Sequence, residues 1–330
     1  MPPWLLPAAV TLMWGANTVL IKVLASVVPP LALAAYRMVF AACFLLPAGW
    51  IAASRARPAA PAERRHTHWL AWWAGLCMTT LHQLFLGMGM LESQASIGAL
   101  ILGLNPLATA LLAAPFAGEP LTPRSVGGAL IGFGGVALAV LDDRWHTAGT
   151  WALGRGELFM FAAMGAYVAG SLIVRNAAGR EPAATFTARM HACGTAVLLA
   201  MLGGAALQHR QPLPMPADVG WWGVIIASGA ISTGLGLLLW NYSIQTWGAT
   251  RTSMFLNGLP LTAMLVAAVG LDERIGWAQW SGLAAVAVGI WLGVGPSGGG
   301  RSGRLWGSVP PSGPAGEVAG RAQTSTIIPS

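Results

Sequence analysis

Long apolar runs separated by short polar gaps dominate the chain. Ten runs are long enough for a helix of roughly 20 residues, the length that spans the hydrocarbon of a bilayer. They cover residues 4–25, 29–50, 69–91, 95–116, 124–141, 152–174, 182–203, 219–244, 250–270 and 276–294. Gaps such as VVPP (27–30) and ESQAS (92–96) are so short that neighbouring helices should run antiparallel. The pattern predicts an all-α polytopic membrane protein with ten transmembrane helices.

Composition strengthens this prediction. Only 9% of the residues are charged and 55% are hydrophobic, whereas a soluble domain carries about 25% charged residues. The net charge of +7 comes from 17 Arg and one Lys, which lie mainly in the gaps between apolar runs. Eleven of these 18 basic residues fall on one side if the N-terminus is cytoplasmic. That bias predicts that both termini are cytoplasmic. It also indicates that the basic residues set the orientation in a lipid bilayer and do not bind nucleic acid.

The two halves of the chain repeat each other. Each half has a proline seven residues before an Arg-Met pair and a proline thirteen residues before a glutamate. The pairs are Pro30 with Arg37, Pro182 with Arg189, Pro106 with Glu119, and Pro260 with Glu273. Since five helices per half is an odd number, the second half should enter the membrane inverted. We expect a first repeat at 1–149, a second at 150–294 and a disordered, Gly/Pro/Ser-rich cytoplasmic tail at 295–330.

Three stretches carry a resemblance to a known family. They are WGANTVLIKVLASVVPPLALAAYRMVFAA (14–42), LNPLATALLAAPFAGEPLTPRSVGGALIGFGGVAL (104–138) and NGLPLTAMLVAAVGLDERIGWAQWSGLAAVAVGIWL (257–292). With them, the chain resembles the EamA branch of the drug/metabolite transporter superfamily. The resemblance implies two inverted five-helix repeats around a central cavity. It also implies export or exchange of small metabolites, such as amino acids, across a bacterial inner membrane. The second half departs from the pattern, because MGAY (164–167) replaces the WG motif and no lysine matches Lys22.

Two prolines fall near the middle of predicted spans. Pro106 and Pro260 should each kink a helix and free a carbonyl at membrane depth, beside Asn105 and Asn257. Such carbonyls must face protein or water. The kinks either line a cavity and flex during gating, or serve packing. Glu119 and Glu273 lie before the next helix and are expected to favour its N-terminus.

Four charged residues lie in or beside predicted spans. Lys22, Arg37 and Glu92 fall toward the outer side and Arg189 toward the inner side. Charges at such depth are rare and usually paired. They form either a charged gate or anion site, or snorkelling side chains and ion pairs, with Glu181 or a helix C-terminus available to Arg189.

Amides and polar aromatics mark the predicted substrate cavity. Its candidate residues are Trp14, Asn17, His82, Gln83, Asn105, Tyr167, Trp240, Asn241 and Asn257. Aromatic rings with polar tips suit a small zwitterion that has an apolar side chain. His82 either titrates in a proton-coupled cycle, for which Glu92 and Glu157 are other candidates, or is a hydrogen-bonded core histidine.

Motifs for other functions are weak. The one GxSG sequence lies at 295–298 in the tail, no HExxH or P-loop occurs, and the HxH at His66 and His68 has no further ligands nearby. We therefore predict no enzyme activity, no metal and no cofactor. The expected partner is a small-molecule substrate, with or without protons, and the protein is a monomer or homodimer. A flippase for lipids or lipid-linked substrates is the alternative, and an intramembrane enzyme is a weaker one.

Overall fold

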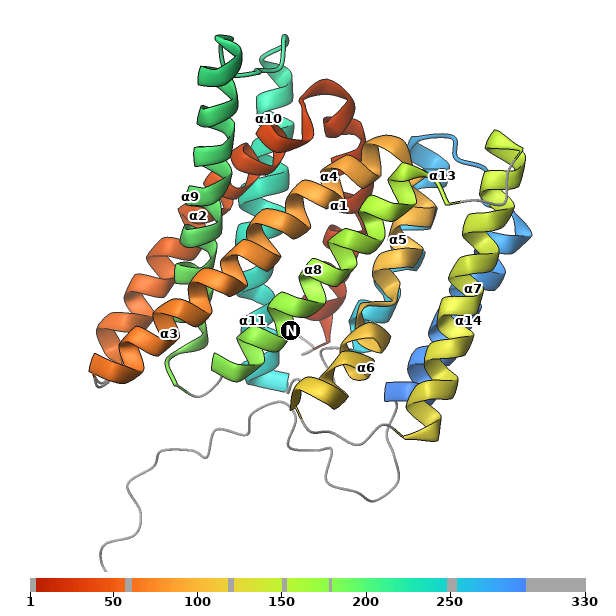
Figure 1. The fold of residues 1–330 in the computed structure, drawn as a ribbon, viewed down its shortest axis with the longest axis horizontal. Helices are drawn as coiled ribbons and strands as arrows, with labels where there is room; N and C mark the ends of the chain where they lie inside the picture. Colours follow the sequence, from red (N-terminus) through yellow and green to blue (C-terminus); the bar gives the residue numbers. More distant parts are fainter. Residues whose placement is uncertain are drawn as a thin grey trace, which may run out of the picture.

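The computed structural model describes residues 4–56, 61–117, 122–149, 153–177, 180–247 and 254–294, in which all regular structure is helical (Figure 1). Within these ranges, seven helices are long and apolar enough to cross a membrane. They cover Leu5–Val27, Pro30–Arg55, Pro61–Glu92, Val126–His146, Arg155–Ala177, Ala183–His209 and Gly220–Ser243. Three shorter apolar helices lie at Ala95–Thr109, Phe255–Gly270 and Trp277–Leu292. The predicted polytopic membrane architecture is confirmed, although three of the ten predicted spans are shorter helices.

The first half of the chain contains two long helices and then several interrupted ones. α1 (Leu5–Val27) and α2 (Pro30–Arg55) are separated by two residues, and Pro30 begins α2. α3 (Pro61–Ala74) continues through a π-helical segment, η1 (Gly75–Leu81), into α4 (His82–Glu92). α5 (Ala95–Gly103) and α6 (Asn105–Ala117) are separated at Leu104, and α7 (Pro123–Ala148) follows.

The second half follows a similar order. α8 (Arg155–Ala177) and α9 (Ala183–His209) are long helices. α10 (Gly220–Ile226) continues through a second π-helical segment, η2 (Ala227–Leu235), into α11 (Gly236–Trp247). A 3-10 turn, η3 (Met254–Asn257), leads into α13 (Gly258–Gly270), and α14 (Trp277–Val294) is the last helix described. Residues 118–121, with Glu119, and the predicted tail at 295–330 lie outside the described ranges.

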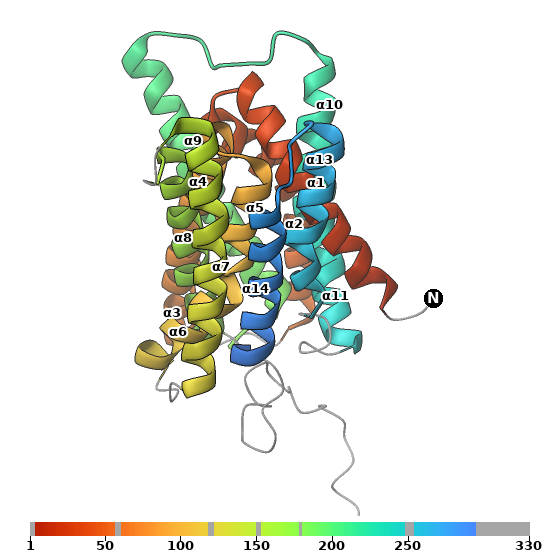
Figure 2. The same cartoon turned by 90° about the vertical axis from the view of Figure 1, so that its right-hand side faces the viewer.

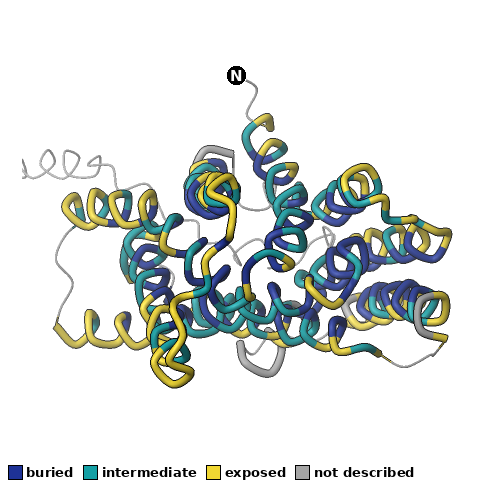
Figure 3. The backbone as a smooth tube through the Cα atoms, turned by 90° about the horizontal axis from the view of Figure 1, so that it is seen from above, coloured by how far each residue is buried: buried dark blue, intermediate teal, exposed yellow. Residues whose placement is uncertain are grey.

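The helices bury one face and leave apolar side chains on the other. Leu24, Leu100 and Met160 are completely buried in a core shared by α1, α5 and α8. Trp50 and Val269, by contrast, are 73% and 87% exposed. In the view from above, buried positions line the contacts between helices and exposed ones lie at the periphery (Figure 3). A surface with large apolar side chains suits lipid contact.

Glycines bring α7 and α14 into close contact. The two helices lie side by side (Figure 2). A Cβ atom on Gly289 would lie 2.4 Å from the carbonyl oxygen of Gly128 and 3.0 Å from the backbone nitrogen of Gly132. Small residues at these positions therefore allow the two backbones to approach closely, as in other membrane helix pairs.

The two central prolines lie where the α-helical pattern is interrupted. Pro106 is the second residue of α6, and Pro260 is the third residue of α13. The first N–H groups of a helix have no acceptor within it, so proline loses no hydrogen bond there. The α-helical pattern is interrupted just before each proline, at Leu104 and at η3.

Candidate functional site

A buried arginine joins the two halves of the molecule. From α2, the Arg37 guanidinium donates three hydrogen bonds, to Ser228 Oγ (2.7 Å), Gln83 Oε1 (2.9 Å) and Thr233 Oγ1 (3.3 Å). Gln83 belongs to α4, whereas Ser228 and Thr233 belong to η2. Gly229 makes the crossing of α2 and η2 possible, because a Cβ atom there would lie only 2.3 Å from the Arg37 carbonyl oxygen.

Arg37 is a deep cation with no carboxylate partner in the described part of the chain. Its residue is 2% exposed, and none of the ion pairs found there involves it. It lies seven residues into α2, or roughly 10 Å along the helix at 1.5 Å per residue. Buried charges in membranes are costly and are normally paired. All three acceptors of Arg37 are neutral, so the pairing is incomplete.

A cavity of about 470 Å³ lies next to this cluster, between α1, η2 and α13. Asn17, Ser228 and Ser232 form its polar lining, and the remaining lining is mainly aliphatic. Asn17 Oδ1 accepts a 2.6 Å hydrogen bond from Ser228 Oγ. The buried hydroxyl of Ser232 has no hydrogen-bond partner. The cavity therefore has a polar wall that is backed by Arg37.

The predicted cavity residues lie at different distances from this space. Asn17 lines the cavity directly. Gln83 and Trp14 lie behind the lining, Gln83 through Arg37 and Trp14 through a 2.8 Å hydrogen bond from its Nε1 to the Ser232 carbonyl oxygen. The Trp14 ring packs against Trp240 with the centroids 5.2 Å apart.

The other predicted cavity residues are elsewhere. His82 Nδ1 lies 2.9 Å from the Ala163 carbonyl oxygen, and its ring packs against Tyr167 at 5.4 Å. These two rings join α4 to α8. Asn105 and Asn241 are half-buried, Asn257 is exposed, and none of the three lines the 470 Å³ cavity. Asn105 Oδ1 is buried without a hydrogen-bond partner.

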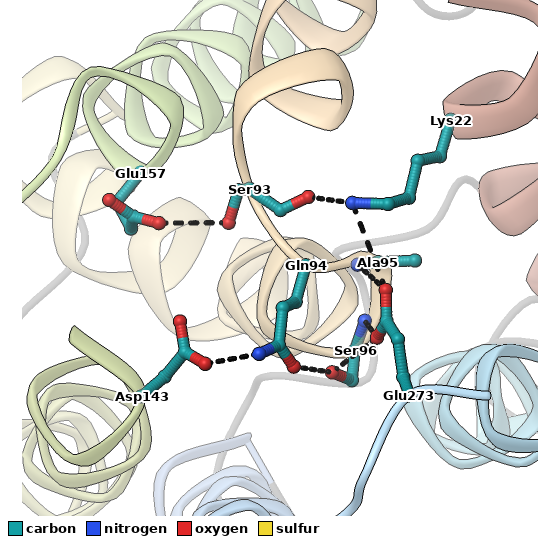
Figure 4. Close-up of polar contacts among 8 residues, drawn as sticks. All are labelled: Lys22, Ser93, Gln94, Ala95, Ser96, Asp143, Glu157 and Glu273. Atoms are coloured by element: carbon teal, nitrogen blue, oxygen red, sulfur yellow. Dashed lines mark hydrogen bonds and ion pairs between the residues drawn. The ribbon is translucent and has the colours of Figure 1, made fainter. Parts of the chain in front are cut away.

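A polar network lies toward the end of the bundle at which α1 ends (Figure 4). Glu273, between α13 and α14, accepts hydrogen bonds from the backbone N–H groups of Ala95 (2.7 Å) and Ser96 (3.0 Å) and from Ser96 Oγ (2.8 Å). Lys22 Nζ lies 3.8 Å from Glu273 Oε1 and also donates to the Ser93 carbonyl oxygen. The network thus ties α1 and α5 of the first half to a loop of the second.

The same network extends to α7 and α8. Ser93 Oγ donates a 2.9 Å hydrogen bond to Glu157 Oε1, and Glu157 Oε2 accepts a 2.7 Å hydrogen bond from the Gly154 backbone N–H. Gln94 Nε2 donates to Asp143 Oδ1. Glu157 is 2% exposed, so this end of α8 is held by a buried carboxylate (Figure 4).

One expectation about carboxylates changes. Glu273 was expected to favour the N-terminus of the helix that follows it, but it caps α5 instead. The loop after α13 reaches across to the first half, where a carboxylate can satisfy two free N–H groups. Glu92 does not join the network: it lies 3.6 Å from Arg155, and the two side chains are 36% and 77% exposed. A solvent-exposed ion pair of this kind contributes little to the stability of the fold.

Arg189 in α9 forms the ion pair that its position suggested. Its Nη2 lies 2.8 Å from Glu181 Oε2, and its Nη1 lies 3.4 Å from Thr67 Oγ1. Glu181 precedes α9, and burial raises the pKa of its carboxyl group above the ordinary value, while the Arg189 charge opposes the rise. Unlike Arg37, its counterpart in the repeat, Arg189 thus has an anionic partner.

Neither a metal site nor the surface groove along α3 provides a second candidate for the functional site in the described part of the chain. The described residues contain no group of three His, Cys, Asp or Glu side chains that could hold a metal ion. A larger groove of about 860 Å³ lies on the surface along α3, lined by Arg64, Arg65, His68 and Trp72 among others. It is separate from the buried cluster.

Comparison with known proteins agrees with this architecture. The model of the EamA-like transporter family matches residues 3–141 and 154–294. An uncharacterized transporter of Synechocystis, sll0355, is 27% identical over 85% of this chain and 86% of its own. The uncharacterized transporter YyaM of Bacillus subtilis is 31% identical, but that match spans only 54% of this chain and 58% of YyaM. A WAT1-related chloroplastic protein of Arabidopsis thaliana is 25% identical over 84% of this chain and 66% of its own.

The fold is also known from a solved structure. A crystal structure that is 20% identical in sequence covers 88% of this chain and 96% of its own, with a TM-score of 0.59. The family match covers nearly all of the described helices, once in each half. The chain belongs to the EamA-like transporter family of the drug/metabolite transporter superfamily, whose members are membrane transporters.

Proposed function

We propose that the protein is a secondary transporter that exports or exchanges small metabolites, such as amino acids or related compounds, by alternating access. The observation that carries the proposal is the Arg37 cluster, a set of polar side chains from both halves beside an open cavity of about 470 Å³ between α1, η2 and α13. Buried polar groups at membrane depth are costly and typically mark a substrate pathway. Because both halves contribute to the cluster, its hydrogen bonds would break or rearrange when one half moves against the other.

Matching features of the two halves support an inverted repeat. Each half has a π-helical segment within its third long helix, η1 in the first and η2 in the second. Each segment is crossed closely by a helix of the other half. A Cβ atom on Gly229 of η2 would lie 2.3 Å from the carbonyl oxygen of Arg37, and one on Gly75 of η1 would lie 2.3 Å from that of Met190. π-Helical segments are frequent at functional sites.

The polar network around Glu273 would be the outer gate in its closed state. The bias of arginines supports cytoplasmic termini, and in that orientation the end at which α1 ends would face outward. There Lys22, Ser93 and Glu273 tie the halves together with groups that can separate and rehydrate. Either the substrate gradient or protons would supply the energy.

Transport by the purified protein tests the proposal. Proteoliposomes would be loaded with single amino acids and related metabolites, and exchange with the labelled compound would be followed. We expect saturable exchange of at least one compound, which Trp14→Ala reduces strongly because it removes the hydrogen bond to the wall of the cavity. Trp50→Ala is the matched control, since Trp50 is 73% exposed on α2. Equal exchange by both variants, or none by folded wild-type protein across the panel, would contradict the proposal.

A further inference from the structure

We propose that the cavity beside Arg37 binds a substrate with an apolar body and a single carboxylate. The carboxylate would lie at the polar wall of the cavity, next to the Arg37 cluster. The inference rests on the transport function proposed above and names the chemical class of its substrate. Three observations carry it: unused hydrogen-bond donors, an unbalanced positive charge and an aliphatic cavity wall.

The cluster contains more donors than acceptors. A guanidinium has five N–H groups, and the hydrogen bonds of Arg37 use three of them. The Ser228 hydroxyl accepts a hydrogen bond from Arg37 and donates one to Asn17 Oδ1. Asn17 and Gln83 therefore both use their oxygens toward the cluster, and the N–H groups of both amides have no acceptor among the described residues.

This arrangement has a direction. Each step from Arg37 through Ser228 to Asn17 runs from donor to acceptor, so the chain ends in the amide N–H groups of Asn17, which lines the cavity. The Ser232 hydroxyl, also in the lining, is buried and lacks a partner. A ligand that completes the site must accept hydrogen bonds. An ionised carboxylate does only that.

Charge points to the same ligand. The carboxylates in the described ranges lie in loops or near the ends of helices, and none pairs with Arg37. One guanidinium is matched by one negative charge, so a monocarboxylate fits better than a dianionic phosphate. The guanidinium lies one hydrogen bond behind the wall, which makes Arg37 a positioning residue that supplies charge through Ser228 and Asn17.

The rest of the cavity selects the body of the ligand. Its lining includes Met13, Leu20, Ile231, Val266 and Leu271. Binding sites of this kind are mainly apolar, with a few polar groups that set orientation. We therefore expect aliphatic or aromatic monocarboxylates, including amino acids with apolar side chains.

The test compares matched ligands by the thermal stability of the detergent-solubilised protein, which does not require transport. Leucine and 4-methylpentanoate are compared with leucinamide, 4-methylpentanamide and isoamylamine, and pentyl phosphate tests the dianion. We expect the two carboxylates to raise the melting temperature of the wild-type protein and the other compounds to have little effect. Arg37→Gln removes the positive charge behind the cavity wall and should weaken carboxylate affinity about ten- to hundredfold. Arg37→Lys should recover part of it.

A second variant keeps the proposal testable if Arg37→Gln does not fold. Asn17→Asp places a carboxylate at the end of the donor chain and should abolish the stabilisation by carboxylates without loss of folded protein. Asn176→Asp makes the same change at an exposed site at the end of α8 and should retain it. Stabilisation by amides, amines or pentyl phosphate at least equal to that by carboxylates overturns the proposal, as does no stabilisation by either carboxylate. Carboxylate binding without exchange in proteoliposomes would instead refute only the transport function.

Discussion

Replacing Glu273 by Gln should open the outer end of the bundle. The carboxylate of Glu273 accepts three hydrogen bonds at the start of α5 and lies 3.8 Å from Lys22, with its side chain only 9% exposed. A hydrogen bond to a charged group contributes about 1.5–3 kcal/mol. Glutamine keeps one neutral oxygen acceptor but loses the charge, so we expect the closed state to lose about 2 kcal/mol in total. That shifts the balance between closed and open states about 30-fold.

Cysteine accessibility measures this shift. Leu20 lines the cavity on α1, and a Leu20→Cys reporter can be built after Cys43, Cys77 and Cys193 are replaced. A membrane-impermeant maleimide added from outside labels the reporter only when the outer end is open. The labelling rate should rise by roughly the factor by which the open population rises, up to about 30-fold.

Glu92→Gln provides the matched control. Glu92 lies near the same end of the bundle, but its pair with Arg155 is exposed to solvent, and such pairs contribute about 0–1 kcal/mol. We expect little change in labelling. If Glu273→Gln labels no faster than Glu92→Gln while both proteins remain folded, the network is not a gate.

Three further changes test other parts of the structure. Gly229→Ala places a methyl group 2.3 Å from the Arg37 carbonyl oxygen and should cost about 1–3 kcal/mol of stability, whereas Gly223→Ala meets no atom within 4 Å; equal melting temperatures would contradict the close crossing. Because the folded-state pKa of the Glu181 carboxyl is raised, its contribution to stability falls as pH rises from about 4.5 through the folded value. The difference between the melting temperatures of wild-type protein and Glu181→Gln should therefore decrease as the pH rises over this range. An increase would contradict the raised pKa of the Glu181 carboxyl group. Pro106→Ala should change stability by less than about 1 kcal/mol, since Pro106 lies in the first turn of its helix; a larger gain in stability would instead indicate that Pro106 distorts the interior of a helix.

The membrane architecture could be predicted because it depends on local composition. Lipid-exposed helices need apolar side chains on most positions, and this produces runs that are visible in the sequence. The interruptions of these helices are different. Nothing in GLCMTTL or ASGAISTGL marks a π-helical segment. Gly75 and Gly229 in these segments are crossed closely by helices distant in the sequence, and a local pattern does not reveal such contacts.

The candidate site could be predicted only in part. Arg37 and Asn17 stand out in the sequence as polar residues in apolar runs. Their partners Ser228 and Thr233 did not, because serine and threonine are common in membrane helices, where they can bond to the backbone of their own helix. Glu273 also stands out in the sequence, but its partners at the start of α5 are 177 and 178 residues away. Pairings over such distances depend on how the halves pack, which local patterns do not reveal.

Reversible locking of the outer end tests alternating access most directly. Lys22→Cys and Glu273→Cys would be combined in the cysteine-free protein and joined by a bifunctional thiosulfonate, whose disulfides a reductant cleaves. A transported compound from the proteoliposome panel then reports exchange before locking, after locking and after reduction. We predict saturable exchange that stops when the two positions are joined and returns on reduction. Exchange that continues at the same rate in fully cross-linked protein would contradict the account.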